Sequence, residues 1–338
     1  MIRSGSPRWS RISAIGIATL LLTLAIAGPW LTPNTPSEQI PESVYAPPML
    51  PRIIDGGHLR FPFVYPLRLT DRLTHSYSED RAQPMRLRFF SRGAFVSVDA
   101  AYGHAWFPLG SDALGRDQLA RLAVGARLSL GVALAAAAGA LLIGAIVGAL
   151  AGFFGGVLDD GLMRIADVIV ALPALYVVLA LRAAMPLVLT GPQVFWTLVL
   201  VLALVGWPFP ARGVRAVVAA ERVREYAESA RALGASRTRL LLRHLLPAAR
   251  GFLIVQATLL VPAFILAEAT LSYVGLGFGA PISSWGAMLR EAGSGRVLVE
   301  APWLLAPATG IVLAALAVNL GLEPASSTVS LPQSDNSY

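Results

Sequence analysis

Residues 129–158 read SLGVALAAAAGALLIGAIVGALAGFFGGVL and contain no charged side chain in thirty positions. A helix needs about 20 apolar residues to cross a bilayer, because the hydrocarbon core is about 30 Å thick. This stretch is therefore long enough to span a membrane. Small residues recur in it every four positions, which indicates a face that packs closely against another helix. They are Ala136, Ala140, Gly144, Gly148, Gly152 and Gly156.

Several other stretches are similarly apolar. With the first, the predicted spans are 12–31, 129–154, 163–183, 193–211, 252–275 and 302–321. Asp167 and Glu268 lie inside two of them. Charges in apolar spans are costly, so they line a cavity or have partners. Each is thus a candidate for the solute path or for a structural pair, such as Asp167 with Arg164.

The composition fits a membrane protein. Of 338 residues, 55% are hydrophobic and 14% are charged, against about 25% charged in a soluble domain. All 27 basic residues are arginine, and lysine and cysteine are absent. The chain therefore has no phosphate-binding Walker lysine, no Schiff-base lysine, and no thiolate nucleophile or ligand.

The first apolar stretch has two interpretations. Arg3, Arg8 and Arg11 precede it, and Ala25-Ile26-Ala27 fits a signal-peptide cleavage site. The uncharged run that continues through Trp30 favours an uncleaved span instead.

Arginines in short loops predict the orientation, because cytoplasmic loops are richer in positive charge. The segment 212–250 carries nine arginines and three glutamates, a net charge of +6. With six spans it lies on the same side as the basic N-terminus, so we expect both in the cytoplasm. The long connection 33–127 would then lie outside.

Residues 33–108 differ from the rest in composition. Proline-rich sequence is followed by short mixed runs, and Met85–Phe90 is typical of a strand. A small, partly β, extracytoplasmic subdomain is predicted. His58, His75 and His104 fall in it at spacings of 17 and 29 residues. These spacings match no metal-ligand pattern, so no metal site is expected.

Residues 110–130 read GSDALGRDQLARLAVGARLSL. Ser111 or Asp112 is a candidate helix N-cap. Asp117 stands four residues before Arg121, where the two can pair on one helix face. We predict an interfacial amphipathic helix whose arginines lie at the level of the lipid headgroups. Those arginines are Arg116, Arg121 and Arg127.

The basic segment 212–250 predicts two helices. Ala219–Leu233 is rich in good helix formers and predicts one uninterrupted helix. Gly234 would end it, Ser236 would cap a second helix, and Pro247 would stop that one. The second helix would expose an apolar face, suited either to anionic lipid or to a groove on a soluble partner. That face comprises Leu240, Leu241, Leu242, Leu245 and Leu246.

This segment resembles the EAA loop of bacterial ABC importer permeases, which reads E-A-A, three residues, G, nine residues, I, one residue, L-P. The matching positions are Glu228, Ser229, Ala230, Gly234, His244, Leu246 and Pro247. Ser229 replaces an alanine and His244 an isoleucine of the pattern. The run Arg243–Pro247 is typical of the oligopeptide/dipeptide branch.

Further segments resemble the same branch, in order along residues 110–320. Gly110–Leu130 is similar to G-T-D-x-x-G-R-D-x-x-S-R-L-x-x-G-A-R-x-S-L. Its matching polar and glycine positions include Asp112, Gly115, Arg116, Asp117, Arg121 and Arg127. Asp159–Pro173, Glu268–Gly277 and Pro281–Leu289 also resemble segments of this branch.

The resemblance implies an all-α polytopic membrane protein of the type I (MetI-like) permease fold, with about six transmembrane helices and a small, partly β insertion. Its expected parts are an N-terminal segment with the first helix (1–32), the insertion (33–109), the permease domain (110–322) and a polar tail (323–338). The family's tail is usually charged, whereas this one is rich in serine.

The resemblance also implies a function. The chain would be a non-catalytic subunit of an ATP-driven importer in the bacterial inner membrane, moving peptides or a related small solute by alternating access. Its partners would be a homologous permease, two cytoplasmic ATPase subunits, an extracytoplasmic solute-binding protein and the bilayer, but no nucleic acid. The chain would bind no cofactor, since ATP and Mg²⁺ would be bound by the ATPases. The short helix after Gly234 would couple ATP hydrolysis by the ATPase subunits to transport by the permeases.

Two other classes are less consistent with the sequence. A secondary transporter would contain an internal repeat, and the six unequal predicted spans show none. An intramembrane hydrolase needs a nucleophile and a base. Ser272 is available as a nucleophile, but no histidine lies in a predicted span.

Overall fold

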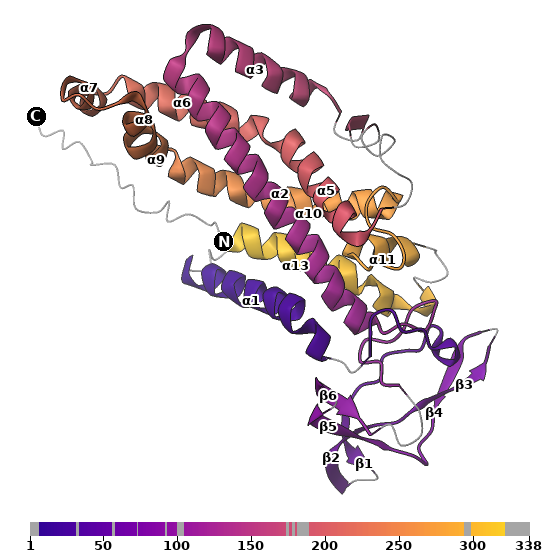
Figure 1. Ribbon diagram of the computed structural model, residues 1–338. Helices are drawn as coiled ribbons and strands as arrows, with labels where there is room; N and C mark the ends of the chain where they lie inside the picture. Colours follow the sequence, from indigo (N-terminus) through magenta and orange to yellow (C-terminus); the bar gives the residue numbers. More distant parts are fainter. Residues whose placement is uncertain are drawn as a thin grey trace, which may run out of the picture.

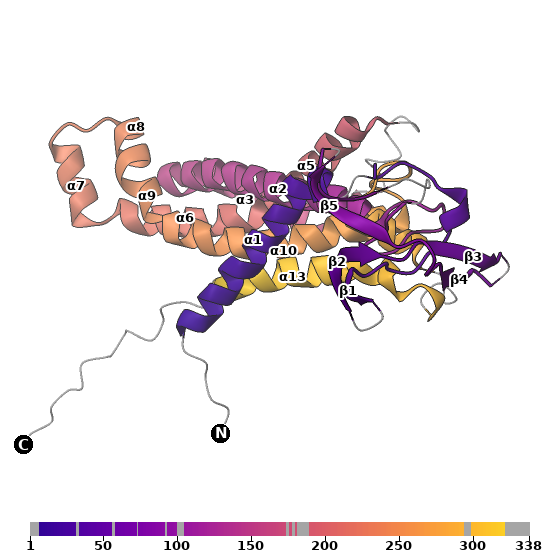
Figure 2. The same ribbon diagram turned by 90° about the horizontal axis from the view of Figure 1, so that it is seen from below.

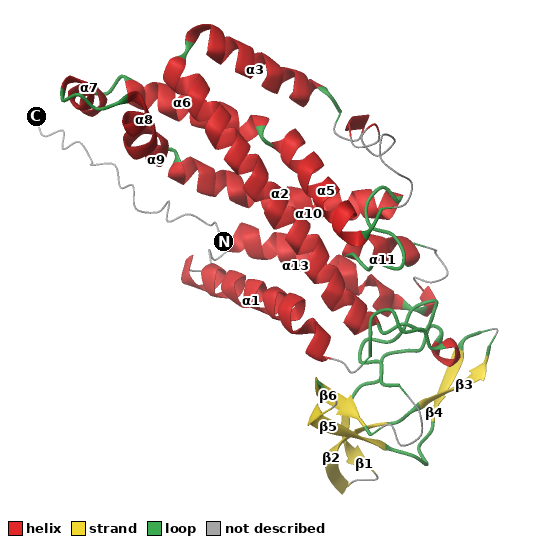
Figure 3. Ribbon diagram, viewed as in Figure 1, coloured by secondary structure: helices red, strands yellow, loops and turns green. Residues whose placement is uncertain are grey.

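The computed structural model describes residues 7–31, 34–55, 58–72, 74–91, 93–99, 105–173, 176–177, 180, 189–293 and 299–321. The helices form an elongated bundle (Figures 1 and 2). A β-rich subdomain lies at one end and a helical loop at the other, and the strands are confined to the first of these ends (Figure 3). The longer helices are α1 (Pro7–Leu31), α2 (Gln118–Phe154), α3 (Gly156–Ala171), α5 (Gly191–Gly206), α6 (Pro208–Arg222), α10 (Arg250–Val274) and α13 (Ala306–Gly321). The shorter ones are α7 (Glu225–Ala232), α8 (Arg237–Leu240), α9 (Leu246–Ala248) and α11 (Trp285–Glu291).

Helix α2 is the centre of the bundle and contacts α1, α5, α6 and α10. Its glycine row faces α6. A Cβ atom on Gly148 would lie 2.3 Å from the Ala211 carbonyl oxygen, and one on Gly152 would lie 2.5 Å from that of Arg215. The predicted close helix–helix contact is therefore confirmed. Gly156 is outside it, because α2 ends at Phe154 and the chain turns there into α3.

Three of the described segments are long and apolar enough to cross a membrane: α2, α10 and 302–321. Helices α5 and α6 make a fourth if they are counted as one span bent by 45°. The bend follows from Pro208 and Pro210, which lack amide hydrogens and interrupt the helical bonding. The other two expected spans correspond to α1 and α3, which are not among these segments. The count of six transmembrane helices therefore stays a prediction.

The limits of α2 and α3 differ from the prediction. Helix α2 begins at Gln118 rather than at 129, so the expected separate interfacial helix is instead the first turns of α2. Helix α3 begins at Gly156 and ends at Ala171, against the predicted 163–183. It ends there because Leu172 is extended, as expected of a residue before proline. Most of 174–183 lies outside the described residues.

The predicted β subdomain is confirmed. Its antiparallel four-stranded sheet has the order β1–β2–β5–β6, and β3 and β4 form a separate two-stranded sheet. The strands are β1 (Arg52–Asp55), β2 (His58–Val64), β3 (Leu67–Asp71), β4 (Ser76–Glu79), β5 (Met85–Ser91) and β6 (Ala94–Val98). Its core includes Met49, Val64, Met85, Leu87, Val98, Trp106 and Phe107. His58 begins β2, His75 precedes β4, and His104 lies outside the described residues.

Candidate functional site

The loop 212–250, called the coupling loop below, is a folded element at the end of the bundle remote from the strands (Figure 1). The expectation of one uninterrupted helix over 219–233 is wrong. Helix α6 ends at Arg222, Val223 and Arg224 leave the helical conformation, and α7 begins at Glu225. The break turns α7 so that Ala227 is fully buried in a cluster with Leu240 and Leu245.

Gly234 has the role expected from the sequence. Its φ is +83°, and it follows Leu233, the C-cap residue of α7. The Ala235 amide donates to the Ala230 carbonyl oxygen at 3.0 Å, and the Gly234 amide donates to that of Arg231 at 2.9 Å. This pair of bonds is the Schellman motif, which favours glycine at the position that Gly234 occupies.

The second helix begins as predicted, but its apolar face is mostly directed inward. Ser236 accepts a hydrogen bond from the Arg239 amide at 3.3 Å and caps α8. Leu240 and Leu245 are 1% and 0% exposed, because both pack in the buried apolar cluster that contains Ala227. Of the five leucines of the predicted apolar face, Leu242 alone is exposed, at 59%. The loop is therefore anchored from within by its own leucines.

The predicted stop at Pro247 is also wrong. A π-helical turn (Leu241–Leu245) follows α8, and Pro247 lies inside the short helix α9, just before α10. Proline is tolerated there because the first amides of a helix have no intrahelical partner. The chain thus returns to the bundle through a nearly continuous helical path.

The residues that match the EAA pattern are distributed over both sides of the coupling loop. Ala230 and Leu246 are half-buried against its apolar cluster. The others face outward, and so do the basic side chains of α8 and the π-turn. The outward residues are Glu228, Ser229, Gly234, Arg237, Arg239, Arg243, His244 and Pro247. The loop presents a largely polar and basic surface with Leu233 and Leu242 exposed on it.

A second group of charged residues lies at the opposite end of α2. Asp112, Arg116, Arg121 and Glu291 form the ion cluster. The Arg116 Nε atom is 2.7 Å from Asp112, and its Nη2 atom is 2.9 Å from Glu291. Arg121 pairs with Asp112 and lies 2.7 Å from Glu291. The two arginine side chains are 5% and 2% exposed. The two arginines are therefore paired inside the protein rather than exposed on the surface of an amphipathic helix, and their depth relative to the headgroups stays a prediction.

Asp117 has a different role from the predicted pairing with Arg121. Its carboxylate caps α2 by accepting hydrogen bonds from the amides of Leu119 and Ala120 at 2.8 and 3.3 Å. The proposed caps Ser111 and Asp112 do not serve α2. Asp112 instead closes its own turn through the amides of Leu114 and Arg116. That turn includes Gly115 with φ +71°, and a Cβ atom there would lie 2.0 Å from the Ile40 carbonyl oxygen.

Arg127 joins α2 to α1. Its guanidinium donates to the backbone carbonyl oxygens of Ala25 and Ile26 at 3.1 and 3.4 Å. These two residues lie in the last turns of α1, so the contact holds the first helix against the centre of the bundle.

The two charges predicted inside apolar spans have unlike surroundings. Asp167 is 65% exposed on this chain and lies 2.6 Å from Arg212 of α6, so the expected pair with Arg164 is wrong. Glu268 is 0% exposed and accepts a hydrogen bond from Ser272 at 2.7 Å. Ser272 in turn accepts one from the amide of Phe278. This network ties α10 to the segment after it and favours the structural interpretation of Glu268.

No sequence motif identified Glu291, Arg212 or Arg215 as a partner in an ion pair. Arg215 forms a two-bond pair with Asp159, with Nη2 at 2.6 Å from the carboxylate. The ion pairs Arg116–Glu291, Asp167–Arg212 and Asp159–Arg215 each join residues at least 45 positions apart. Local spacing rules score only neighbours on one helix face, so no local signal identifies such partners.

A bundle of long apolar helices around a glycine-lined contact, with a basic folded loop at one end, defines an α-helical integral membrane protein. The chain belongs to the family of binding-protein-dependent transport system inner membrane components, which matches residues 140–323. The resemblance inferred from the sequence motifs is thereby confirmed, together with the helical permease fold. The family description is that of inner-membrane components of binding-protein-dependent transport systems.

Relatives in this family are peptide permeases. The chain is 42% identical over 200 residues to the oligopeptide transport system permease protein OppC of Bacillus subtilis, covering 59% of this chain and 62% of that one. It is 42% identical over 216 residues to the dipeptide permease DppC of the same organism, covering 64% and 65%. It is 33% identical over 303 residues to the di/tripeptide permease DppC of Pseudomonas aeruginosa, covering 89% and 81%.

A solved structure also matches, that of the inward-facing MetNI methionine ABC transporter. The TM-score is 0.46 at 19% identity, over 59% of this chain and 93% of that one.

Proposed function

We propose that the chain forms part of the translocation path of an ATP-driven importer of short peptides. The observation that carries the proposal is its similarity to permeases named for oligopeptide, dipeptide and di/tripeptide transport. The family match over 140–323 includes the whole coupling loop. The solute class therefore rests on the relatives, and the role of the loop rests on its geometry.

We further propose that the coupling loop docks on a cytoplasmic ATPase. The loop projects from the end of the bundle and is held rigid by its buried leucines. Its outward surface is basic and carries exposed Leu233 and Leu242, a combination suited to an apolar groove with acidic margins. ATP and Mg²⁺ would be bound by two such ATPase subunits. A homologous permease would complete the path, and an external binding protein would deliver the solute.

Assembly provides the first test. Expressed with a homologous permease and ATPase subunits, the chain should co-purify with them and support ATP-dependent uptake of labelled dipeptides and oligopeptides into proteoliposomes with the binding protein. The chain alone should neither hydrolyse ATP nor move solute. Uptake by the chain alone, driven by an ion gradient, would instead identify a secondary transporter and contradict the proposal.

Orientation provides the second test. The net charge of +6 on the coupling loop supports a cytoplasmic position by the positive-inside rule, and the β subdomain at the other end of the bundle would then be periplasmic. Alkaline phosphatase fused after Gly57 should be active, and the same reporter fused after Gly234 should be inactive. The reverse pattern would exclude docking of this loop on a cytoplasmic ATPase.

A further inference from the structure

The β subdomain exposes several phenylalanine rings. Phe61, Phe89, Phe90 and Phe95 are 63%, 49%, 82% and 40% exposed. Phe90, Phe95 and Trp30 line one cavity, and we call these three side chains the aromatic surface. Large clusters of exposed apolar side chains mark contacts with a protein or a membrane, so we expect one of these to cover this surface.

The rings contact one another and lie apart from the core of the subdomain. Phe90 and Phe95 meet edge to face at 5.7 Å between ring centroids, and Phe61 and Phe89 do so at 6.2 Å. The β5–β6 register, with Ser91 opposite Ala94, places Phe90 across from Phe95. Phe90 also has a φ of +52°, which is uncommon for a bulky residue. The hairpin thus holds its most exposed ring outward.

The aromatic surface continues an apolar stripe on α1. Ile15, Leu22, Ile26 and Trp30 follow one another at helical spacing along one face of that helix. They are 66%, 50%, 63% and 49% exposed. The opposite face of α1 packs on α2 and α13 through Ala14, Leu21 and Ala25, which are buried. In a membrane protein, such an exposed apolar stripe contacts lipid or another membrane helix.

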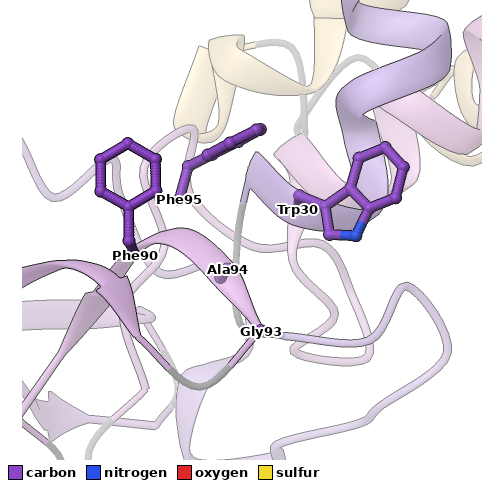
Figure 4. Close-up of a pocket in the computed structure, with 5 residues that line it drawn as sticks. All are labelled: Trp30, Phe90, Gly93, Ala94 and Phe95. Carbon is purple, nitrogen blue, oxygen red and sulfur yellow. The ribbon is translucent and has the colours of Figure 1, made fainter.

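The stripe and the hairpin meet at a cavity. Helix α1 contacts β6, and a cavity of about 440 Å³ is lined by Trp30, Phe90, Gly93, Ala94 and Phe95. Figure 4 shows the rings of Phe90 and Phe95 next to each other, with the Trp30 indole across the cavity. The lining is almost wholly apolar, and the cavity lies at the Trp30 end of the apolar stripe.

We propose that the aromatic surface lies in the interfacial layer of the bilayer and that this cavity takes a lipid acyl chain. Tryptophan and tyrosine are enriched at the boundary between hydrocarbon and headgroups, and phenylalanine, which has no polar group, favours the apolar side of that boundary. Trp30 marks that boundary on α1, and Phe90 and Phe95 lie beside it. The β subdomain is therefore anchored to the membrane surface by its β5–β6 hairpin. This inference goes beyond peptide transport and does not depend on the solute.

The test uses the absence of cysteine from the chain. Single-cysteine variants Phe90→Cys and Phe95→Cys of the full chain are labelled with bimane. They are reconstituted in nanodiscs of phosphatidylcholine and phosphatidylglycerol, with and without dibrominated acyl chains. Bromine quenches fluorophores in contact with it, so both labels should lose fluorescence in brominated lipid. The matched control is Ala82→Cys, an exposed site in the β4–β5 connection, whose fluorescence should not change.

Two outcomes would overturn the proposal. Fluorescence at 90 and 95 as insensitive to brominated lipid as at 82 would show that the subdomain stands clear of the bilayer. Labels that are insensitive to brominated lipid but become shielded from aqueous iodide when the homologous permease is added would assign the surface to a protein partner. If Phe90→Cys fails to insert, Phe95→Cys, which also lines the cavity, provides the measurement.

Discussion

Gly234→Val is expected to reduce ATP-driven uptake strongly while leaving the chain inserted and paired with its partner permease. Gly234 has φ +83°, and a Cβ atom there would meet nothing within 4 Å. The whole effect of the substitution is therefore backbone strain, of about 1–3 kcal/mol for a β-branched residue in this region. Relief of that strain would redirect 236–246, the segment that we propose docks on the ATPase.

The expected size follows from the strain. If the loop must regain its native conformation to dock, about 1–3 kcal/mol corresponds to roughly 5- to 150-fold weaker ATPase association. Pull-down of the ATPase and peptide uptake by the assembled complex measure the two effects. Gly234→Asn is the matched control, because asparagine tolerates this backbone conformation. It should retain most uptake.

Glu228→Ala should have a smaller effect, because Glu228 is exposed and even an exposed ion pair contributes only about 0–1 kcal/mol. Normal uptake with Gly234→Val at normal expression would show that the coupling loop is a passive element at the membrane surface.

Arg121→Ala is expected to cause the largest loss of stability. The Arg121 side chain is 2% exposed, bonded to Asp112 and Glu291, and donates to Ser283 at 2.9 Å. Removing one partner of a buried ion pair costs about 3–5 kcal/mol, because the remaining charge is buried without compensation. Here two arginines balance two carboxylates, and the substitution would leave Asp112 and Glu291 with Arg116 alone.

Thermal unfolding in detergent, followed by the circular dichroism of the helices, measures this loss. Arg88→Ala serves as the control, because the Arg88–Asp99 pair is 61% and 42% exposed and such pairs contribute about 0–1 kcal/mol. The double variant Arg121→Met, Asp112→Asn restores the charge balance and should recover part of the stability. Equal unfolding temperatures for Arg121→Ala and Arg88→Ala would contradict a structural role for the ion cluster.

Features with a local cause were predictable from the sequence. The apolar windows identified α2, α10 and 302–321, because span length depends only on bilayer thickness. The four-residue glycine spacing identified the α2–α6 contact, since such positions share one helix face. Gly234 and Ser236 were placed correctly because both act through backbone groups within five residues of themselves.

Helix limits in the coupling loop were not predictable in the same way. The composition of 219–233 favours an unbroken helix, but propensities amount to tenths of a kcal/mol per residue. Burying Ala227 against Leu240 and Leu245 outweighs them and breaks the helix after Arg222. The same packing turned a predicted exposed leucine face inward.

The sequence by itself determined the class of protein, its apolar helices, the glycine contact and the turn at Gly234, because each depends on composition or on neighbours a few residues away. Only the tertiary structure decided which charges meet. Arg121 bonds Glu291 across 170 residues and Asp167 bonds Arg212 across 45. The electrostatic energy of these pairs depends on distance and burial in space, and neither quantity is set by separation along the chain.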